Sequence, residues 1–307
     1  MNRRDFFKKT TYAGIAAYSY ISFGKSINAF TNPKTANTDI YDLVAIKGGE
    51  PDAMFDKAIQ SFGGMKNFDK KNQTVVIKPH IGWDTIPERA ANTNPKLIRQ
   101  IVKHCFDAGA KDVYVFDHTC DDWRSCYSSS GIEEAAKDVG AKVVPGNSES
   151  YYQDVDVPMG KRLKDASVHE LILESDVFIN VPILKSHGGA TLTVSMKNLM
   201  GIVWDRRYWH RNDLHQCIAD FSTFRKPDLN IVDAYSVMKK NGPRGVSEAD
   251  VVTMKSQIIS ADIVAADAAA AKLFGKAPSD IDYINYASEM KIGNMDLSKL
   301  KINRVIL

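Results

Sequence analysis

Short β-branched runs that alternate with amphipathic helical segments are the feature that most restricts the fold of this chain. The runs predict strands at residues 42–47, 73–78, 112–117, 141–144, 177–181, 229–233 and 256–260. The segments between them predict helices at about 51–62, 95–108, 131–139, 167–174, 213–223, 262–274 and 279–290. Such an alternation favours a mostly parallel sheet with helices on both faces. We therefore predict an α/β fold, built as one large domain or as two intimate lobes.

The first 29 residues have the pattern of an export signal. Two arginines precede an aromatic pair, a lysine and a modest apolar run (Arg3, Arg4, Phe6, Phe7, Lys8). The paired arginines resemble the twin-arginine leader, and the apolar run is too short to span a membrane comfortably. An uncleaved amphipathic anchor is the alternative. Export would place the protein in the periplasm or another extracytoplasmic space, with the twin-arginine translocase as its partner.

This leader suggests a division of the chain into three parts. We expect a signal peptide at 1–29, a polar, turn-rich linker at 30–40 and a single α/β domain at 41–307. The whole chain has 40 basic and 37 acidic residues, and cleavage after residue 29 removes five basic residues and one acidic residue, so the net charge changes from +3 to −1. A nearly neutral mature protein lacks the basic footprint of a nucleic-acid-binding protein.

Absent motifs exclude several cofactors. The four cysteines form no CxxC pair, so we predict neither a zinc ribbon nor a built-in iron–sulfur cluster. A disulfide between Cys120 and Cys126 stays open. The sequence has no GxGxxG after its first strand and no GxxxxGK[ST], which argues against NAD and against a P-loop nucleotide.

Titratable residues follow most of the predicted strands. Ligands of open parallel sheets bind outside the carboxyl ends of the strands, so these residues are expected to share one edge. They are Lys78, His80, Asp117, His118, Asp121, Lys185, His187 and Asp233. Asp262, after the last strand, is better explained as a helix cap. Asp267 lies within an Ala-rich helix and needs a partner there.

Three further stretches could contribute to a site at this edge. In KSHGGATLTVSMKN (185–198), two glycines permit close backbone approach, and the stretch ends with Lys197 and Asn198. The stretch 196–215 interleaves cations, aromatic residues and His210, which is typical of a ligand-covering loop. The loop NGPRG (241–245) contains Gly242 and Arg244 and could be an anion nest or only a structural turn.

Several phrases together resemble domain-of-unknown-function family 362. They are VVIKPH (75–80), FINVPILKSH (178–187), SMKNLMG (195–201), NIVDA (230–234), NGPRG (241–245) and SADIVAADAAAAKLFG (260–275). The similarity extends over about residues 42–293 and is greatest with an exported subgroup that carries a twin-arginine leader. The resemblance implies shared polar positions at Lys78, Lys185, His187, Lys197, Asn198, His210, Asp233 and Asp267. It implies no settled activity.

Two departures from the family pattern have consequences. His80 stands where the family often has Asn, which adds a base or ligand to the site. The ferredoxin-like cysteine segment of some members is absent, so we do not predict electron transfer through a built-in cluster.

We interpret these residues as the site of an enzyme that acts on a small carboxylate or phosphate. We assign catalytic roles to Lys78, Lys185, His187, Lys197, His210 and Asp233, and substrate-binding roles to His80, Asn198, Arg244 and Gly242. Lysines can hold anions or act as bases when their pKa is lowered, and His transfers protons near neutral pH.

Two alternatives remain. The first is a divalent-metal enzyme that uses the same edge, with Asp117, His118 and Asp121 as mixed nitrogen and oxygen ligands. The second is a periplasmic binding or accessory protein that holds a small molecule without converting it. The sequence decides neither the substrate nor the reaction.

Overall fold

The computed structural model describes residues 41–307, so the predicted signal peptide and linker lie outside the described residues. Within this range the strands are β1 (Leu43–Lys47), β2 (Thr74–Pro79), β3 (Asp112–Val115), β4 (Lys142–Val143), β5 (Tyr152–Asp156), β6 (Asp165–His169), β7 (Val177–Val181), β8 (Ile183–His187), β9 (Thr191–Thr193), β10 (Leu229–Met238), β11 (Val251–Ser260) and β12 (Ile302–Ile306). The helices are α2 (Pro51–Gln60), α3 (Pro95–Ala108), α4 (Trp123–Ser129), α5 (Ile132–Lys137), α6 (Glu170–Glu174), α7 (Ser195–Asn198), α8 (Arg206–Arg211), α9 (Leu214–Phe221), α10 (Ile263–Phe274) and α11 (Asp282–Glu289). No helix in this range is long and apolar enough to cross a bilayer.

The main sheet has the strand order β12-β1-β11-β10-β7-β2-β3-β4. Five neighbouring strands, from β10 to β4, are parallel. This confirms the predicted α/β fold with a mostly parallel sheet. Strand β11 is the exception, because it pairs antiparallel with both β1 and β10. Its carboxyl end, and Asp262 after it, therefore lies at the opposite edge from the ends of β2, β3 and β7, which corrects the expectation that this strand also leads to the shared edge.

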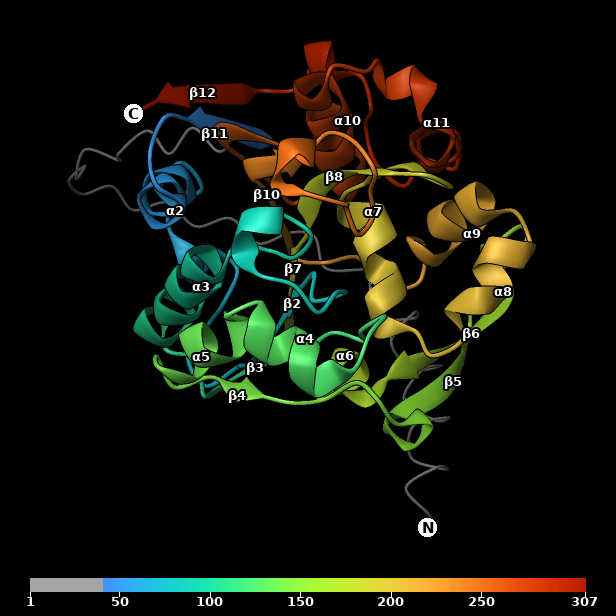
Figure 1. Cartoon of the computed structure of the whole chain (residues 1–307), viewed down its shortest axis with the longest axis horizontal. Coiled ribbons are helices and arrows are strands. Elements are labelled where there is room, and N and C mark those ends of the chain that lie inside the picture. Colours follow the sequence, from blue (N-terminus) through green and yellow to red (C-terminus); the bar gives the residue numbers. More distant parts are fainter. Residues whose placement is uncertain (1–40) are drawn as a thin grey trace, which may run out of the picture. The chain divides into compact units, whose positions relative to one another are not determined.

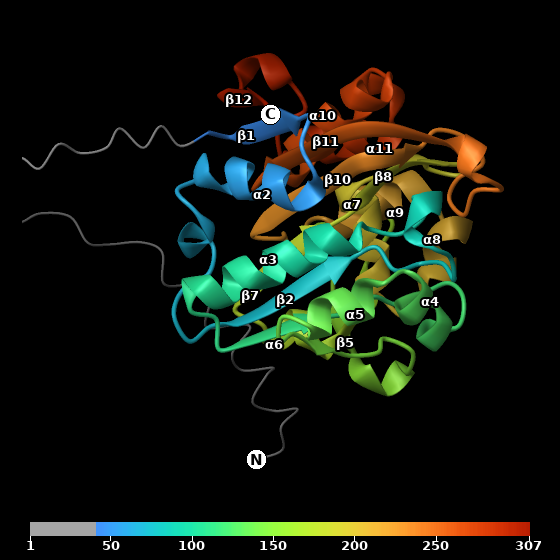
Figure 2. The same cartoon turned by 60° about the vertical axis from the view of Figure 1, so that its left-hand side comes forward.

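Two hydrophobic clusters cover the two faces of the sheet. Neighbouring residues of β2 belong to different clusters, Val75 and Ile77 to one and Val76 to the other, as the two-residue period of a strand requires. Helices α2, α3 and α5 pack on the first face, where α3 lies over β2 (Figure 2). Helices α7, α9, α10 and α11 pack on the second face (Figure 1).

Helix α3 illustrates how the sequence sets an element. Its N-cap Asn94 accepts the Lys96 N–H at 3.0 Å, Pro95 occupies the first turn, and Gly109 ends the helix at a φ of 107°. Glycine adopts this left-handed conformation without steric cost. The predicted bounds of this helix, 95–108, agree with the structure.

Several short elements were not predicted. Strands β5 and β6 form a separate antiparallel pair, and β6 occupies the start of the segment predicted as a helix at 167–174. Strands β8 and β9 form a hairpin beside β10, and β12 pairs with β1. Helices α4 and α8 were also missed. Most of these elements have six residues or fewer, which is too short to show a clear hydrophobic period.

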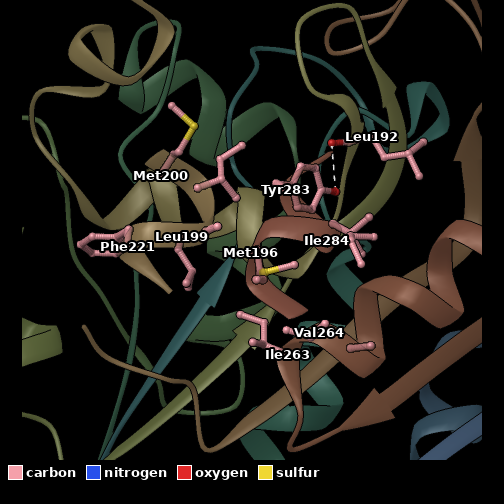
Figure 3. Close-up of a cluster of buried hydrophobic side chains, with 14 of the residues drawn as sticks. Leu192, Met196, Leu199, Met200, Phe221, Ile263, Val264, Tyr283 and Ile284 are labelled. Atoms are coloured by element: carbon pink, nitrogen blue, oxygen red, sulfur yellow. Dashed lines mark hydrogen bonds between the residues drawn. The ribbon is translucent and has the colours of Figure 1, made fainter. Parts of the chain in front are cut away.

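Helix α7 is held in place by the second hydrophobic cluster. Figure 3 shows Met196 of α7 among Ile263, Val264 and Ile284. In the same cluster the hydroxyl of Tyr283 donates to the backbone carbonyl of Leu192, at 3.4 Å (Figure 3). This apolar anchorage positions the polar residues of α7 at the carboxyl edge of the sheet.

Candidate functional site

A cavity of about 540 Å³ lies at the carboxyl ends of the parallel strands. Its walls come from the segments after β2 and β3, from the β8–β9 hairpin, from α7 and α8, and from the Gly242–Pro243 loop. The lining residues are Lys78, His80, Gly82, Trp83, Asp117, His118, Cys120, His187, Gly188, Gly189, Thr193, Lys197, Asn198, Met200, Gly201, Arg206, Arg207, His210, Gly242 and Pro243. The cavity is of ordinary size for a small-molecule site.

A buried ion pair forms the floor of this cavity. The Nζ of Lys78 lies 3.0 Å from Oδ1 of Asp117, and both side chains are almost completely buried. Asp117 Oδ2 also accepts the N–H of Ile81 at 2.7 Å. Burial lowers the pKa of Lys78 to about 8 and raises the pKa of Asp117, because each charged form loses its hydration. The mutual attraction of the pair opposes both shifts.

Asn198 connects this ion pair to His80. Its Oδ1 accepts from Lys78 Nζ at 2.6 Å and contacts Nδ1 of His80 at 3.1 Å. Its Nδ2 donates to Oδ1 of Asn180 at 2.8 Å, and Asn180 in turn donates to Oδ1 of Asn230. The chain of amides fixes the orientation of Asn198, so its carbonyl oxygen is directed to Lys78 and His80.

The side chains of Lys185 and His80 contact each other, so the two nitrogens that meet are not free. Lys185 Nζ lies 3.0 Å from Nε2 of His80 and donates to the carbonyls of Ala91 and Pro243, at 2.7 Å each. Its side chain is fully buried and does not line the cavity. Burial sets the pKa of Lys185 well below its usual value. The structure therefore does not support the predicted catalytic role of Lys185, and assigns it a positioning role between β8, the 80–91 segment and the Pro243 loop.

Lys197 is placed differently from the other two lysines. It lines the cavity and is half-buried, and the one hydrogen-bond partner of its amine among residues 41–307 is the thioether sulfur of Met200 at 3.0 Å. Sulfur is a weak acceptor. Burial, followed by the positive charges of Arg206 and Lys78, lowers the pKa of Lys197 to about 8.

His187 and His210 line the cavity side by side. Their rings are stacked with centroids 6.3 Å apart. His187 Nδ1 accepts the N–H groups of Gly189 and Ala190, so its Nε2 carries the proton in the neutral ring. Burial and then the charge of Lys197 lower the pKa of His187 to about 3, and the same two causes lower the pKa of His210. Because its Nδ1 is occupied, His187 offers the cavity a hydrogen-bond donor and no acceptor nitrogen.

His118 has the opposite arrangement of ring nitrogens. Its Nδ1 lies 3.0 Å from the carbonyl oxygen of Val203, which requires a proton on Nδ1 and leaves Nε2 as an acceptor. The ring stacks on Trp204 with centroids 4.9 Å apart. Burial and then the charge of Arg206 lower the pKa of His118 to about 4. At neutral pH the imidazole of His118 is therefore uncharged, fixed in orientation, and has Nε2 available as an acceptor.

Positive side chains outnumber negative ones in the lining. Arg206 donates to the backbone carbonyls of His118 and Thr119, at 2.8 and 2.7 Å, and has no carboxylate partner within the described range. Lys78, Lys197, Arg206 and Arg207 all line the cavity, whereas Asp117 is its one carboxylate among residues 41–307. Because Asp117 already pairs with Lys78, the lining has an excess of positive charge.

The 241–245 loop contributes only one of its two predicted residues. Gly242 lines the cavity through its backbone, and a Cβ there would lie 1.9 Å from the carbonyl oxygen of Ser186. Arg244 lies outside the lining, where it pairs with Asp121 at 3.3 Å and faces solvent. Its guanidinium carbon lies 5.6 Å from the centre of the Trp83 ring, and Trp83 does line the cavity.

Two buried carboxylates near the site have structural partners. Asp233, predicted to be catalytic, accepts the N–H groups of Asn94 and Tyr235 and does not line the cavity. Asp267 accepts the N–H groups of Ser195 and Met196 at 2.7 and 3.0 Å. The partner that Asp267 requires is thus the first turn of α7, the helix that carries Lys197.

The three residues considered as metal ligands are separately engaged. Asp117 pairs with Lys78, His118 bonds to Val203, and Asp121 pairs with Arg244. Within residues 41–307, no three His, Cys, Asp or Glu side chains are grouped so that they could hold a metal ion. The described geometry therefore does not assemble the predicted cluster. Cys120 and Cys126 are both free thiols, the first exposed and the second buried.

Sequence reasoning missed several parts of the lining. Trp83 and Gly201 follow no strand directly, and neither residue type signals a site by itself. A Cβ at Gly201 would lie 1.9 Å from Oδ1 of Asp117 and 2.6 Å from Nζ of Lys78, so only glycine fits against the ion pair. Arg206 could have been found, because it lies in the cation-rich stretch 196–215.

Comparison with known proteins places this geometry in a family. The model of the family described as Domain of unknown function (DUF362) matches residues 75–272, more than half of the chain. The chain is 26% identical over 193 residues to a thylakoid-associated protein of Synechocystis sp., and the alignment covers 60% of this chain and 59% of that protein. The residues that line the cavity run from Lys78 to Pro243 and lie entirely inside the matched range.

 

Two solved structures show a partial similarity. One is the lactate racemase apoprotein from Thermoanaerobacterium thermosaccharolyticum, with a TM-score of 0.44, 14% identity, and coverage of 77% of this chain and 58% of that chain. The other is a protein from Thermotoga maritima, with a TM-score of 0.46, 10% identity, and coverage of 78% and 60%. This chain spans less than two thirds of the length of each of these relatives.

Proposed function

The chain belongs to the DUF362 family, whose name assigns no activity, and we propose from its own site that it is an enzyme acting on a small anionic substrate. One observation carries this proposal. The cavity is lined by four cationic side chains and, within the described residues, by a single carboxylate that is already paired. An excess of positive charge in a partly enclosed cavity attracts carboxylates and phosphates.

Lys197 and the two arginines of α8 supply the cations for the substrate. Neither the Lys197 amine nor the Arg206 guanidinium has a carboxylate partner in the range 41–307, so both retain charge for a ligand. Arg207 lines the same wall and is exposed. Hydrogen bonds between such cations and an anionic oxygen are roughly twice as strong as neutral ones.

His118 is the best-placed group for proton transfer. Its Nδ1 is fixed by the Val203 carbonyl and its ring by Trp204, which leaves Nε2 to accept a proton from a bound substrate. The sequence favours His187 or His210 in this role, but Nδ1 of His187 is occupied by two backbone N–H groups. The Nε2–H of His187 would instead donate a hydrogen bond to the substrate.

The test is conversion of a substrate in deuterated water. A panel of small carboxylic and oxo acids is incubated with the protein, and NMR spectroscopy follows deuterium incorporation or product formation. We expect at least one acid to change, and His118→Asn to slow that change by about 100-fold or more. Asn keeps a donor for the Val203 carbonyl but lacks Nε2. His104→Gln, on α3 and beside Asp56, is the matched control.

The outcome also separates an enzyme from a binding protein. If acids bind but remain unchanged after long incubation with folded protein, the enzyme proposal fails and a ligand-binding or accessory role replaces it. If His118→Asn converts the acid at the wild-type rate, the assigned base is wrong.

We also propose that the protein is exported by the twin-arginine translocase. The support is the sequence of residues 1–29 alone, because these lie outside the described residues. Cell fractionation of the full-length chain is expected to find it outside the cytoplasm. The Arg3→Lys/Arg4→Lys variant is expected to remain in the cytoplasm, and equal export of this variant would refute the proposal.

A further inference from the structure

Two lysines, Lys78 and Lys197, line the cavity and a third, Lys185, is buried beside it; the amines of Lys78 and Lys185 are fully engaged. Lys78 bonds to Asp117 and Asn198 and is 1% exposed. Lys185 contacts His80 and two backbone carbonyls and is 0% exposed. An amine in such a position cannot turn toward a ligand without leaving buried acceptors unsatisfied, which is unfavourable.

Lys197 lacks such constraints. Its amine contacts only the sulfur of Met200 among the described residues, and its side chain is part of the cavity wall. The neighbouring cations Arg206 and Lys78 oppose its protonation, and burial acts in the same direction, so its pKa is about 8. A fraction of the molecules therefore has a neutral, nucleophilic amine at neutral pH.

We propose that Lys197 forms a covalent imine with a 2-oxo acid bound in the cavity. This inference rests on the proposed function, because it names the substrate class for the same anion site. The cationic lining holds the carboxylate of the oxo acid, and the adjacent carbonyl carbon is the group that an amine attacks. A simple carboxylate or phosphate lacks this carbon and would bind without reacting.

The covalent step is balanced without any other reactant. The nitrogen of Lys197 forms a bond to the carbonyl carbon, and the carbon–oxygen double bond is replaced by a carbon–nitrogen double bond. The amine loses two protons, and the carbonyl oxygen leaves with them as water. No group is oxidised or reduced. The imine then takes up one proton from water, and the protonated imine withdraws electrons from the neighbouring carbon, where His118 is proposed to remove a proton.

The test traps the imine by reduction. The protein is incubated separately with pyruvate, 2-oxobutyrate and 2-oxoglutarate in the presence of sodium cyanoborohydride, and intact-mass and peptide-mass spectrometry locate the adduct. We expect one adduct per chain, with the mass of the oxo acid less one oxygen atom, on Lys197. Lys197→Arg retains the positive charge but not the nucleophile, so it should bind the oxo acid and yield at least tenfold less adduct. Lys103→Arg, on the exposed side of α3, should react like wild type.

Calorimetry with the same acids separates the two ways of failing. If the wild type binds an oxo acid but forms no adduct, or if the adduct lies on another lysine, the imine inference is overturned while the anion site stands. If Lys197→Arg forms the adduct in equal yield, the inference is also overturned. If no small anion binds at all, the proposed function fails, and the imine fails with it.

Discussion

Gly201 shows at the residue scale how closely the backbone approaches the ion pair of the cavity floor. The N–H of His118 also donates to the Gly201 carbonyl, at 3.0 Å, so this residue connects the ion pair to the proposed base. Any side chain at Gly201 would displace Lys78 or Asp117, since a Cβ would overlap both of them.

We predict that Gly201→Ala lowers the free energy of unfolding by about 1–3 kcal/mol, the usual cost of overpacking. Gly188→Ala is the matched control, because a Cβ at Gly188 has no neighbour within 4 Å. It should change the free energy of unfolding by less than about 0.5 kcal/mol. Urea denaturation measures both. Equal stability of the two variants would contradict the close packing around the ion pair.

Some residues of the site could be predicted from the sequence, and others could not. Lys78, Asp117 and His187 lie at strand ends and reach the cavity, as the parallel-sheet rule implies. The same rule also selected Lys185 and Asp233. In the structure, however, these two side chains bond to backbone groups instead. Which way a side chain points after a strand depends on tertiary contacts that no local pattern contains.

Helix α7 shows the same limit at the element scale. It has only four residues, and its first N–H groups are capped by Asp267, which lies 71 positions or more away in the chain. The pattern around Asp267 showed that a partner was required, but it could not show which one. The long, strongly amphipathic α3 was predictable because its caps and its apolar face are local.

We predict that Asp267→Ala lowers the free energy of unfolding by about 3 kcal/mol, since two buried N–H groups lose their acceptors. It should also weaken anion binding, because α7 carries Lys197. Asp262→Ala is the matched control. Asp262 caps α10 by accepting the N–H groups of Val264 and Ala265, but it lies at the opposite edge of the sheet. This control should lose stability and keep its ligand affinity in calorimetry; equal loss of affinity in both variants would contradict the assigned role.

The His169 cap of helix α6 can be tested through the pH dependence of stability. His169 caps it by accepting the N–H of Leu171 through Nδ1, and burial lowers the pKa of His169 to about 4. The unfolded chain, with a pKa near 6.5, takes up this proton first, so stability is lost as pH falls from about 6.5 to 4. We predict that wild type loses up to about 3 kcal/mol relative to His169→Asn over this range. Asn retains a cap and removes the titration. A constant stability difference between pH 7 and 4 would contradict this assignment.

The fold class of the whole molecule could be predicted from the sequence, but the direction of β11 and the order of the strands could not. The alternation of strands and helices gave the mostly parallel sheet, because each run is long enough to show its period. It did not give the antiparallel β11, since the direction of a strand is decided by the connection that precedes it and by its neighbours. The order of the strands, which brings β2, β3 and β7 together under one cavity, is likewise a property of the assembled sheet.

At the scale of the whole molecule, the proposed function requires the cation-rich cavity to bind small anions. Isothermal titration calorimetry with a panel of small carboxylates, oxo acids and inorganic phosphate tests it most directly. We predict saturable one-to-one binding of at least one of them, with a dissociation constant about 10- to 100-fold higher in Lys197→Met, because a charge-assisted hydrogen bond contributes about 1.5–3 kcal/mol. Lys103→Met should bind like wild type. Absence of binding across the panel, or equal affinity in Lys197→Met, would contradict the account.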